Sequence, residues 1–331
     1  MNNSFVLIPA FEQNNVAVCF ASDNKFAPYC AVAIKSLIDS ASDLNNYDVV
    51  ILDDGVSEQN KQKIISLAQN KGNISIRFFN IEYIFNRYDN NIFYTHWHFS
   101  RAAYNRLFTP EIFAHYQKVL YLDSDIIILD DIAKLFQTDV SNKVFGVMPS
   151  TARFYNNPEQ CLPNYTKHLE NFVKNRYDCY NSAVLLLNIP IMIEKQFTKK
   201  CLDALELYKT PQHVDQDLLN IAFPPEHLSQ LDPLWAYTPM YKWLYNGDTK
   251  NYTAYFNTLR VKIKEDAKLI HYLTNNKPWK PNSQWIDENK YWWSFLSKTP
   301  FFEQVLSDFM ADMQKKLLKL ENYEKQEKSN A

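Results

Sequence analysis

Glycine is rare in this sequence. The 331 residues include only Gly55, Gly72, Gly146 and Gly247. A Gly-x-Gly-x-x-Gly turn or a Walker-type phosphate loop needs several glycines within a few residues, so neither motif can be formed here. If the protein binds a diphosphate, a metal ion must therefore neutralise much of the charge.

Paired cysteines, an excess of one charge and long apolar runs are also missing. The cysteines are Cys19, Cys30, Cys161, Cys179 and Cys201, and no two of them form a Cys-x-x-Cys pair. This spacing indicates free core thiols in a reducing compartment rather than disulfides or a zinc site. A net charge of -2 gives no basic field for a nucleic-acid partner. No apolar run reaches the roughly 18 residues of a membrane-spanning helix, and no signal-peptide pattern opens the chain. These features predict a cytoplasmic protein.

The first part of the chain alternates between strand and helix patterns. Val16–Asp23 is typical of a buried strand, and Ala27–Ile38 has helical spacing. Asp48–Leu52 and Ile74–Phe79 predict two further strands, with a helix that opens near Ser57 between them. Alternation with short connections favours an α/β fold with a doubly wound, mostly parallel sheet.

The stretch Lys118–Asp131 is central, because two acids interrupt an apolar run rich in β-branched residues. Such a run is typical of a strand buried on both faces, where a carboxylate needs a cationic partner. Asp123 and Asp125 are two positions apart, so at the carboxyl end of a strand they point the same way and can converge on one hard cation. A strand that ends in an Asx turn is the plainer alternative for an isolated Asp-x-Asp.

Later segments add candidate site residues. Ser100–Phe108 has helical spacing, and Arg101 and Arg106 lie on different faces of that helix, so only one is expected to point into a site. The polar insertion at 150–180 has the length of a lid or a binding loop. Further strands are predicted at Val144–Met148 and Ala183–Asn188, and a helix at about Ile191–Tyr208.

Three further segments of the sequence carry polar residues that could bind a ligand. Asp215-Gln216-Asp217 opens a predicted helix with more polar side chains than capping requires. His271 lies on a short apolar strand, where a lone histidine is usually a core residue, but it can complete the ligand set of the Asp pair. Asp23 and Asn24 end the first strand, where a nucleotide can be bound, although an N-cap is the simpler role for Asp23.

Six short segments in order resemble family 8 glycosyltransferases, the retaining enzymes that include glycogenin and the bacterial lipopolysaccharide galactosyl- and glucosyltransferases. They are Phe20-Ala21-Ser22-Asp23-Asn24, Ala103-Tyr104-Asn105-Arg106-Leu107, Tyr121-Leu122-Asp123-Ser124-Asp125, Tyr180-Asn181-Ser182-Ala183-Val184, Asp215-Gln216-Asp217, and His271-Tyr272 followed by Lys277-Pro278-Trp279. The resemblance runs from about residue 16 to residue 285. It implies a GT-A-type domain at 1–285 and a C-terminal helical extension at 286–331.

The resemblance also implies a role for each matching position. The nucleotide would be held by Ala21, Asp23, Asn24 and Ser124, and the diphosphate would be reached by Lys277. The ligands of Mn²⁺ or Mg²⁺ would be Asp123, Asp125 and His271. The donor sugar would be surrounded by Arg106, Asn181, Asp215 and Gln216.

Three positions depart from the family pattern and bear on specificity. Ser150 stands where many members carry an acid, Ala183 where many carry glycine, and Thr274 begins a turn that often contains glycine.

From the family resemblance we expect a metal-dependent retaining hexosyltransferase that uses UDP-galactose or UDP-glucose. A glycan or glycolipid of a bacterial surface polysaccharide or lipopolysaccharide is the expected acceptor. A nucleotide-sugar hydrolase and a non-catalytic glycan-binding module are the alternatives.

The C-terminal third is rich in aromatic residues and ends in an amphipathic pattern. The aromatic side chains of 232–256 are expected to fill a core rather than to form a sugar platform. The apolar positions of 301–322 recur at intervals of three and four, which predicts a helix: Phe302, Leu306, Phe309, Met313, Leu317 and Leu320. We expect this helix to pack on its own domain or to pair with a second copy, with at most weak peripheral membrane contact at the inner face.

Overall fold

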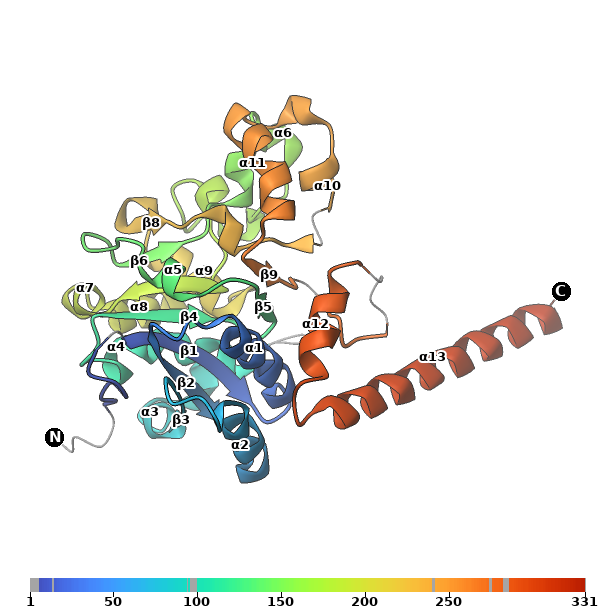
Figure 1. The fold of residues 1–331 in the computed structure, drawn as a ribbon. Helices are drawn as coiled ribbons and strands as arrows, with labels where there is room; N and C mark the ends of the chain where they lie inside the picture. Colours follow the sequence, from blue (N-terminus) through green and yellow to red (C-terminus); the bar gives the residue numbers. More distant parts are fainter. Residues whose placement is uncertain are drawn as a thin grey trace.

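The computed structural model describes residues 6–13, 15–93, 95, 100–239, 242–273, 276–281 and 286–330. Within them a seven-stranded sheet has the order β3-β2-β1-β4-β7-β6-β8, and a two-stranded sheet pairs β5 with β9 (Figure 1). The strands are β1 (Asn15–Asp23), β2 (Asn46–Asp54), β3 (Ile74–Asn80), β4 (Lys118–Leu122), β5 (Ile126–Ile128), β6 (Phe145–Val147), β7 (Val184–Asn188), β8 (Leu228–Gln230) and β9 (Leu269–His271).

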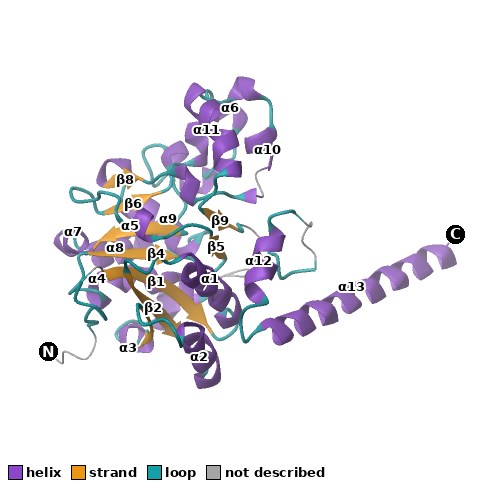
Figure 2. Ribbon diagram, viewed as in Figure 1, coloured by secondary structure: helices purple, strands orange, loops and turns teal. Residues whose placement is uncertain are grey.

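Helices flank the central sheet (Figure 2). They are α1 (Ala27–Ser40), α2 (Glu58–Ile65), α3 (Glu82–Phe85), α4 (Thr109–Ile112), α5 (Ala133–Phe136), α6 (Pro158–Cys161), α7 (Ile189–Glu194), α8 (Phe197–Tyr208), α9 (Val214–Ala222), α10 (Lys242–Asn246), α11 (Ala254–Glu265), α12 (Asn289–Leu296) and α13 (Phe302–Asn330). The predicted helix at Ser100–Phe108 is a 3-10 helix, Arg101–Phe108.

Alternate residues of β1 enter two separate cores, one on each face of the sheet. Val18 and Phe20 pack with α1, whereas Ala17 and Cys19 pack with the 3-10 helix, α8 and α9. Burial of both faces is the reason that these strands consist of continuous apolar runs. The doubly wound α/β prediction is therefore confirmed, and the five cysteines are free thiols.

The sheet is mixed at its centre. The strand pairs β1–β2, β2–β3, β1–β4 and β6–β8 are parallel, while β7 runs antiparallel to both β4 and β6. Leu122 at the end of β4 is therefore opposite Val184 at the start of β7. This pairing brings the segment before β7 next to Asp123, whose amide donates to the carbonyl oxygen of Ala183 at 2.9 Å.

Two predicted elements are wrong in detail. The stretch Lys118–Asp131 is not one strand, because β4 ends at Leu122 and β5 joins the small sheet, where Ile126 pairs with His271. The helix expected at Ile191–Tyr208 is broken between α7 and α8. Gln196 has a left-handed φ of 55°, and this turn places Phe197, only 2% exposed, in the core.

The aromatic region after residue 230 fills a core, as predicted. Trp235, Tyr237 and Phe256 are buried. The ring of Phe256 stacks at 4.3 Å on that of Phe154, which belongs to the polar insertion. The insertion and α11 thus form one helical lobe at the top of Figure 1. Of the aromatic residues in this region, Tyr241 and the side chain of Trp243 lie outside the described part.

The C-terminal helix α13 leaves the body of the molecule (Figure 1). Val305 is buried, and the ring of Phe309 contacts that of Trp293 at 5.2 Å. Beyond these first turns Met313 is partly buried, but four other apolar side chains are more than half exposed: Met310, Leu317, Leu318 and Leu320. Among the described side chains, the start of this helix packs on its own domain, and pairing with a second copy stays a prediction for the rest. No helix in the described part of the chain is both long and apolar enough to cross a membrane.

Candidate active site

A cavity of about 710 Å³ opens where β1 and β4 end. Its size is typical of a site for a small organic ligand. All but one of the predicted site residues line it: Ala21, Asp23, Arg106, Asp123, Ser124, Asp125, Asn181, Asp215, Gln216, His271 and Lys277. The exception is Asn24.

Two acids and a histidine converge at one end of this cavity. Asp123 follows β4, Asp125 precedes β5, and the pairing of β5 with β9 places His271 beside them. One ligand atom from each of the three side chains lies within 4.8 Å of the others. Two carboxylates and an imidazole are a donor set suited to Mn²⁺ or Mg²⁺.

Asp125 has the electrostatics of a cation ligand. Burial raises the pKa of its carboxyl, but the Lys277 ammonium and the His271 imidazole hold that pKa well below its ordinary value. Lys277 forms an ion pair with Oδ2, and its Nζ also donates to the carbonyl oxygen of Tyr272 at 2.6 Å. The other oxygen, Oδ1, is buried and lies 3.4 Å from His271 Nε2, but no contact from the described residues has the geometry of a hydrogen bond to it. An ionised carboxylate whose buried oxygen faces an imidazole nitrogen without a hydrogen bond fits a divalent cation.

Arg106 links the acid pair to the opposite wall of the cavity. Its side chain is 5% exposed, and Nη2 donates to Asp123 Oδ1 at 2.7 Å while Nε lies 2.9 Å from Asp215 Oδ2. The guanidinium also stacks 4.3 Å from the ring centre of Tyr121. Burial lowers the pKa of Arg106, but the two carboxylates raise it above its ordinary value. This one cation therefore compensates two acids.

The other arginine of the same 3-10 helix lies outside the cavity. Arg101 pairs with Asp54 and Glu82. The prediction that only one of the two arginines points into the site is confirmed.

Asp215 is held in an environment that favours its neutral form. The carboxyl is buried, and Ser182 Oγ donates to its Oδ2 at 3.0 Å. Burial raises the pKa of Asp215 to about 7, with Arg106 opposing and Asp123 adding to the rise. A carboxyl with this pKa can exchange a proton near neutral pH.

We expect the raised pKa of Asp215 to make the metal-free protein less stable as pH rises. The folded state holds a proton that the unfolded state loses near pH 3.8, so the stabilisation is complete below that pH and is lost as pH passes about 7. The contribution to the slope is at most about 1.4 kcal/mol per pH unit. Urea unfolding of wild type and Asp215→Asn across this range measures it. The exposed Asp203→Asn variant is the control, and equal slopes in all three proteins would contradict the assignment.

Gln216 and Asn181 form a hydrogen-bonded pair beside Asp215. Asn181 Nδ2 donates to Gln216 Oε1 at 2.8 Å, and the amide of Ser182 donates to the same oxygen at 3.3 Å. Gln216 lies in the first turn of α9, which starts at Val214 with a φ of 39°. A positive φ at a β-branched residue is strained, and such strain is common at functional sites.

The end of β1 supplies the remaining predicted residues. Ser124 Oγ donates to the carbonyl oxygen of Ala21 at 3.0 Å, which ties the acid pair to β1. Asp23 lines the cavity and also accepts a hydrogen bond from the amide of Phe26 at 2.8 Å, so the simpler role occurs as well. Asn24 instead accepts hydrogen bonds from the Ser57 amide and Asn60 Nδ2, both at 2.9 Å.

The three departures from the family pattern have different surroundings. Ser150 is buried and donates to the carbonyl oxygen of Tyr177 at 2.7 Å. Ala183 lines the cavity. Thr274 lies outside the described residues.

Sequence reasoning missed the wall that the insertion contributes. Asn164, Tyr165 and Thr166 line the cavity, together with His213 just before α9. Only the length and polarity of 150–180 signalled a binding loop, and no pattern distinguished these residues from their neighbours.

A family model matches nearly the same part of the chain as the sequence resemblance. Residues 17–283 match the glycosyl transferase family 8. The chain belongs to this family. The family 8 match covers every segment on which the sequence resemblance rested.

Curated relatives of this family 8 chain are distant. It is 20% identical to General stress protein A of Bacillus subtilis over 276 residues, which are 82% of this chain and 89% of that protein. It is 24% identical to the glycosyltransferase GlyE of Streptococcus pneumoniae over 270 residues, which are 80% of this chain but 56% of the relative.

Two solved structures show the fold. The galactosyltransferase LgtC, in complex with donor and acceptor sugar analogues, superposes with a TM-score of 0.67 at 24% identity, covering 86% of this chain and 96% of LgtC. The bifunctional glycosyltransferase WbbM has a TM-score of 0.72 at 23% identity, covering 91% of this chain and 53% of WbbM. The family 8 chain thus has a GT-A fold with a helical C-terminal part, and it spans about half of WbbM and of GlyE.

Proposed function

We propose that the protein is a metal-dependent, retaining glycosyltransferase that moves galactose or glucose from a UDP-sugar to a glycan or glycolipid. One observation carries the proposal. Asp123, Asp125 and His271 form a group that could bind a cation. This group lines the same cavity as Lys277 and the Arg106–Asp215 ion pair. We assign the diphosphate to the surroundings of the cation group and Lys277, and the sugar to the surroundings of Arg106 and Asp215.

The diphosphate end is designed to stabilise a leaving group. Asp123, Asp125 and His271 would hold Mn²⁺ or Mg²⁺, which when bound neutralises phosphate charge. Lys277 contributes a second positive charge from the same wall. Charge on the diphosphate grows as the glycosidic bond breaks, so these cations stabilise the transition state more than the bound substrate.

The sugar end favours attack on the same face as the departing diphosphate. An amide is a weak nucleophile, and the Gln216 oxygen is already occupied by Asn181 Nδ2 and the Ser182 amide. A covalent sugar on Gln216 would use one of the two lone pairs that accept these hydrogen bonds, so at least one of them would be lost. We therefore assign Gln216, Asn181, Asp215 and Arg106 to positioning of the donor sugar, and retention to front-face attack by the acceptor.

Relatives support the choice of sugar and acceptor. LgtC is named as a galactosyltransferase and was solved with donor and acceptor sugar analogues. A role in bacterial surface polysaccharide or lipopolysaccharide synthesis would place the protein in the cytoplasm, with at most weak peripheral contact at the inner face of the membrane. The domain boundary at 285 and 286 belongs to the same proposal.

The direct test is product stereochemistry. Incubation with UDP-galactose or UDP-glucose, Mn²⁺ and a panel of oligosaccharide acceptors, followed by NMR of the early product, should show an α-linked sugar. An inverted β-product would contradict the assignment of Asp215 and Gln216. Free sugar released at an equal rate without acceptor would support the hydrolase, and binding without turnover would support the glycan-binding module.

We propose that a second copy of the chain covers the exposed stripe of α13. The net charge of residues 311–331 is only +1, which gives little attraction to an anionic membrane. The five lysines are Lys315, Lys316, Lys319, Lys325 and Lys328, and the four acids are Asp312, Glu321, Glu324 and Glu327. Sedimentation velocity should show a dimer for the full chain and a monomer after truncation at Thr299. Strong pelleting of the full chain with anionic vesicles at low salt, lost on truncation, would make α13 a membrane anchor instead.

A further inference from the structure

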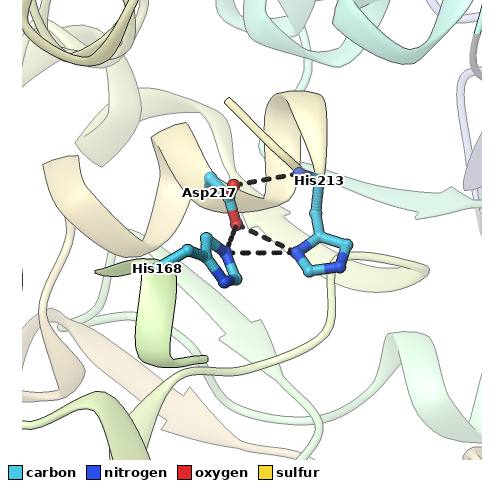
Figure 3. Close-up of side chains that lie close together, drawn as sticks. All are labelled: His168, His213 and Asp217. Carbon is cyan, nitrogen blue, oxygen red and sulfur yellow. Dashed lines mark hydrogen bonds and ion pairs between the residues drawn. The ribbon is translucent and has the colours of Figure 1, made fainter. Parts of the chain in front are cut away.

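Two histidines and an aspartate meet on the wall between the insertion and α9 (Figure 3). His168 lies in the 3-10 helix Lys167–Leu169 of the insertion, His213 precedes α9, and Asp217 lies in the first turn of α9. His168 Nε2 and His213 Nδ1 are 3.0 and 3.4 Å from the same oxygen, Asp217 Oδ1. The two nitrogens are 3.3 Å from each other.

Hydrogen bonds leave one edge of this triangle unused. Both rings face the same oxygen of the Asp217 carboxylate, Oδ1, so the two imidazole nitrogens share one acceptor. If both nitrogens carry protons, two N–H groups face each other. If either nitrogen is bare, its lone pair faces the carboxylate. In each arrangement one edge of the triangle is therefore not a hydrogen bond, whereas a central cation uses all three atoms, because each then donates an electron pair.

The spacing matches one class of cation. Bonds of about 2.0–2.1 Å at a tetrahedral angle place neighbouring ligand atoms roughly 3.3 Å apart, and the three observed separations are 3.0, 3.3 and 3.4 Å. A ligand set of two imidazoles and one carboxylate also favours Zn²⁺ over Mg²⁺. We propose that His168, His213 and Asp217 bind Zn²⁺, separately from the cation held by Asp123, Asp125 and His271.

The surroundings support a site that is oriented and accessible. The amide of His213 donates to Asp217 Oδ2 at 2.9 Å, which turns Oδ1 toward the two rings. Asp217 and His168 are 1% and 12% exposed, whereas His213 is 42% exposed and lines the main cavity. The ion can enter from the cavity, and its fourth position is left to water or to a ligand there.

The bound zinc joins two segments that are distant in the chain. It fastens the insertion to the start of α9, the turn that carries Asp215 and Gln216 and contains the strained Val214. The ion thus acts as a clamp on the wall of the cavity. Its binding can be measured without donor or acceptor, so this test does not depend on the proposed transferase activity.

Cobalt is the probe, because tetrahedral Co²⁺ absorbs visible light far more strongly than octahedral Co²⁺. Titration of the metal-free full chain should give an intense band that saturates at about one equivalent and is bleached by Zn²⁺. His213→Ala should lose the band, and its half-exposed ring makes retention of the fold expected. His168→Ala should lose the band as well.

Two variants complete the design. His115→Ala removes an exposed histidine outside the cluster and should keep the band. Asp125→Asn weakens the other cation site and should also keep it. The absence of an intense band in wild type, or its survival in both His213→Ala and His168→Ala with circular dichroism unchanged, would overturn the zinc assignment.

Discussion

Asp125→Asn is expected to lower transfer at least about a hundredfold while the fold is retained. The substitution keeps the shape of the side chain but removes the charge that faces His271 and Lys277. The cation site then has a single carboxylate, and the diphosphate loses most of its neutralisation. Transfer rates with saturating Mn²⁺, together with circular dichroism, measure the two effects.

The matched control is Asp130→Asn. Asp130 pairs with Lys134 in an exposed ion pair and does not line the cavity, so transfer should be unchanged. Excess chelator should reduce wild-type transfer to the level of Asp125→Asn. Full activity in that variant, or in chelated wild type, would show that the acid pair holds no essential cation.

Arg106→Met should cost about 3–5 kcal/mol of the free energy of unfolding. It leaves the carboxylates of Asp123 and Asp215 in the cavity wall without their shared cation. The loss should be smaller at pH 5 than at pH 8, because a protonated Asp215 needs no partner. Urea unfolding at both pH values gives the comparison.

Arg101→Met is the paired control for this prediction. Its guanidinium belongs to the same 3-10 helix but is 26% exposed, so the expected loss is within about 1 kcal/mol. Equal losses in the two variants would mean that Arg106 contributes no more than an ordinary partly exposed arginine. A loss that does not depend on pH would also contradict the role assigned to it.

The sequence predicts the alternating core and the convergence of the acids, but not which sheet each strand joins. β5 and all of β4 after Lys118 are buried, so both strands are apolar although they belong to different sheets. The pairing of β5 with β9 separates them, and this is a contact between distant segments. Likewise, apolar spacing continues through Gln196, and the break there depends on a left-handed residue.

The sequence also identifies apolar helix faces and polar side chains, but not the segments that contact them. The stripe at intervals of three and four identifies the start of α13 as a helix, yet nothing in that spacing says what covers it. His168 and His213 are 45 positions apart, and although Asp217 follows His213 by four positions, no spacing in the sequence brings His168 to this pair. Their contact with Asp217 arises from the way the insertion folds back on α9.

Thermal unfolding with UDP and Mn²⁺ tests the central claim most directly. If Asp123, Asp125, His271 and Lys277 bind a metal and a diphosphate together, the two ligands should raise the melting temperature by about 2 °C or more beyond the sum of their separate effects. The same excess should vanish in Asp125→Asn and persist in Asp130→Asn. A purely additive shift in wild type, or no shift at all, would contradict a shared metal and nucleotide-sugar site.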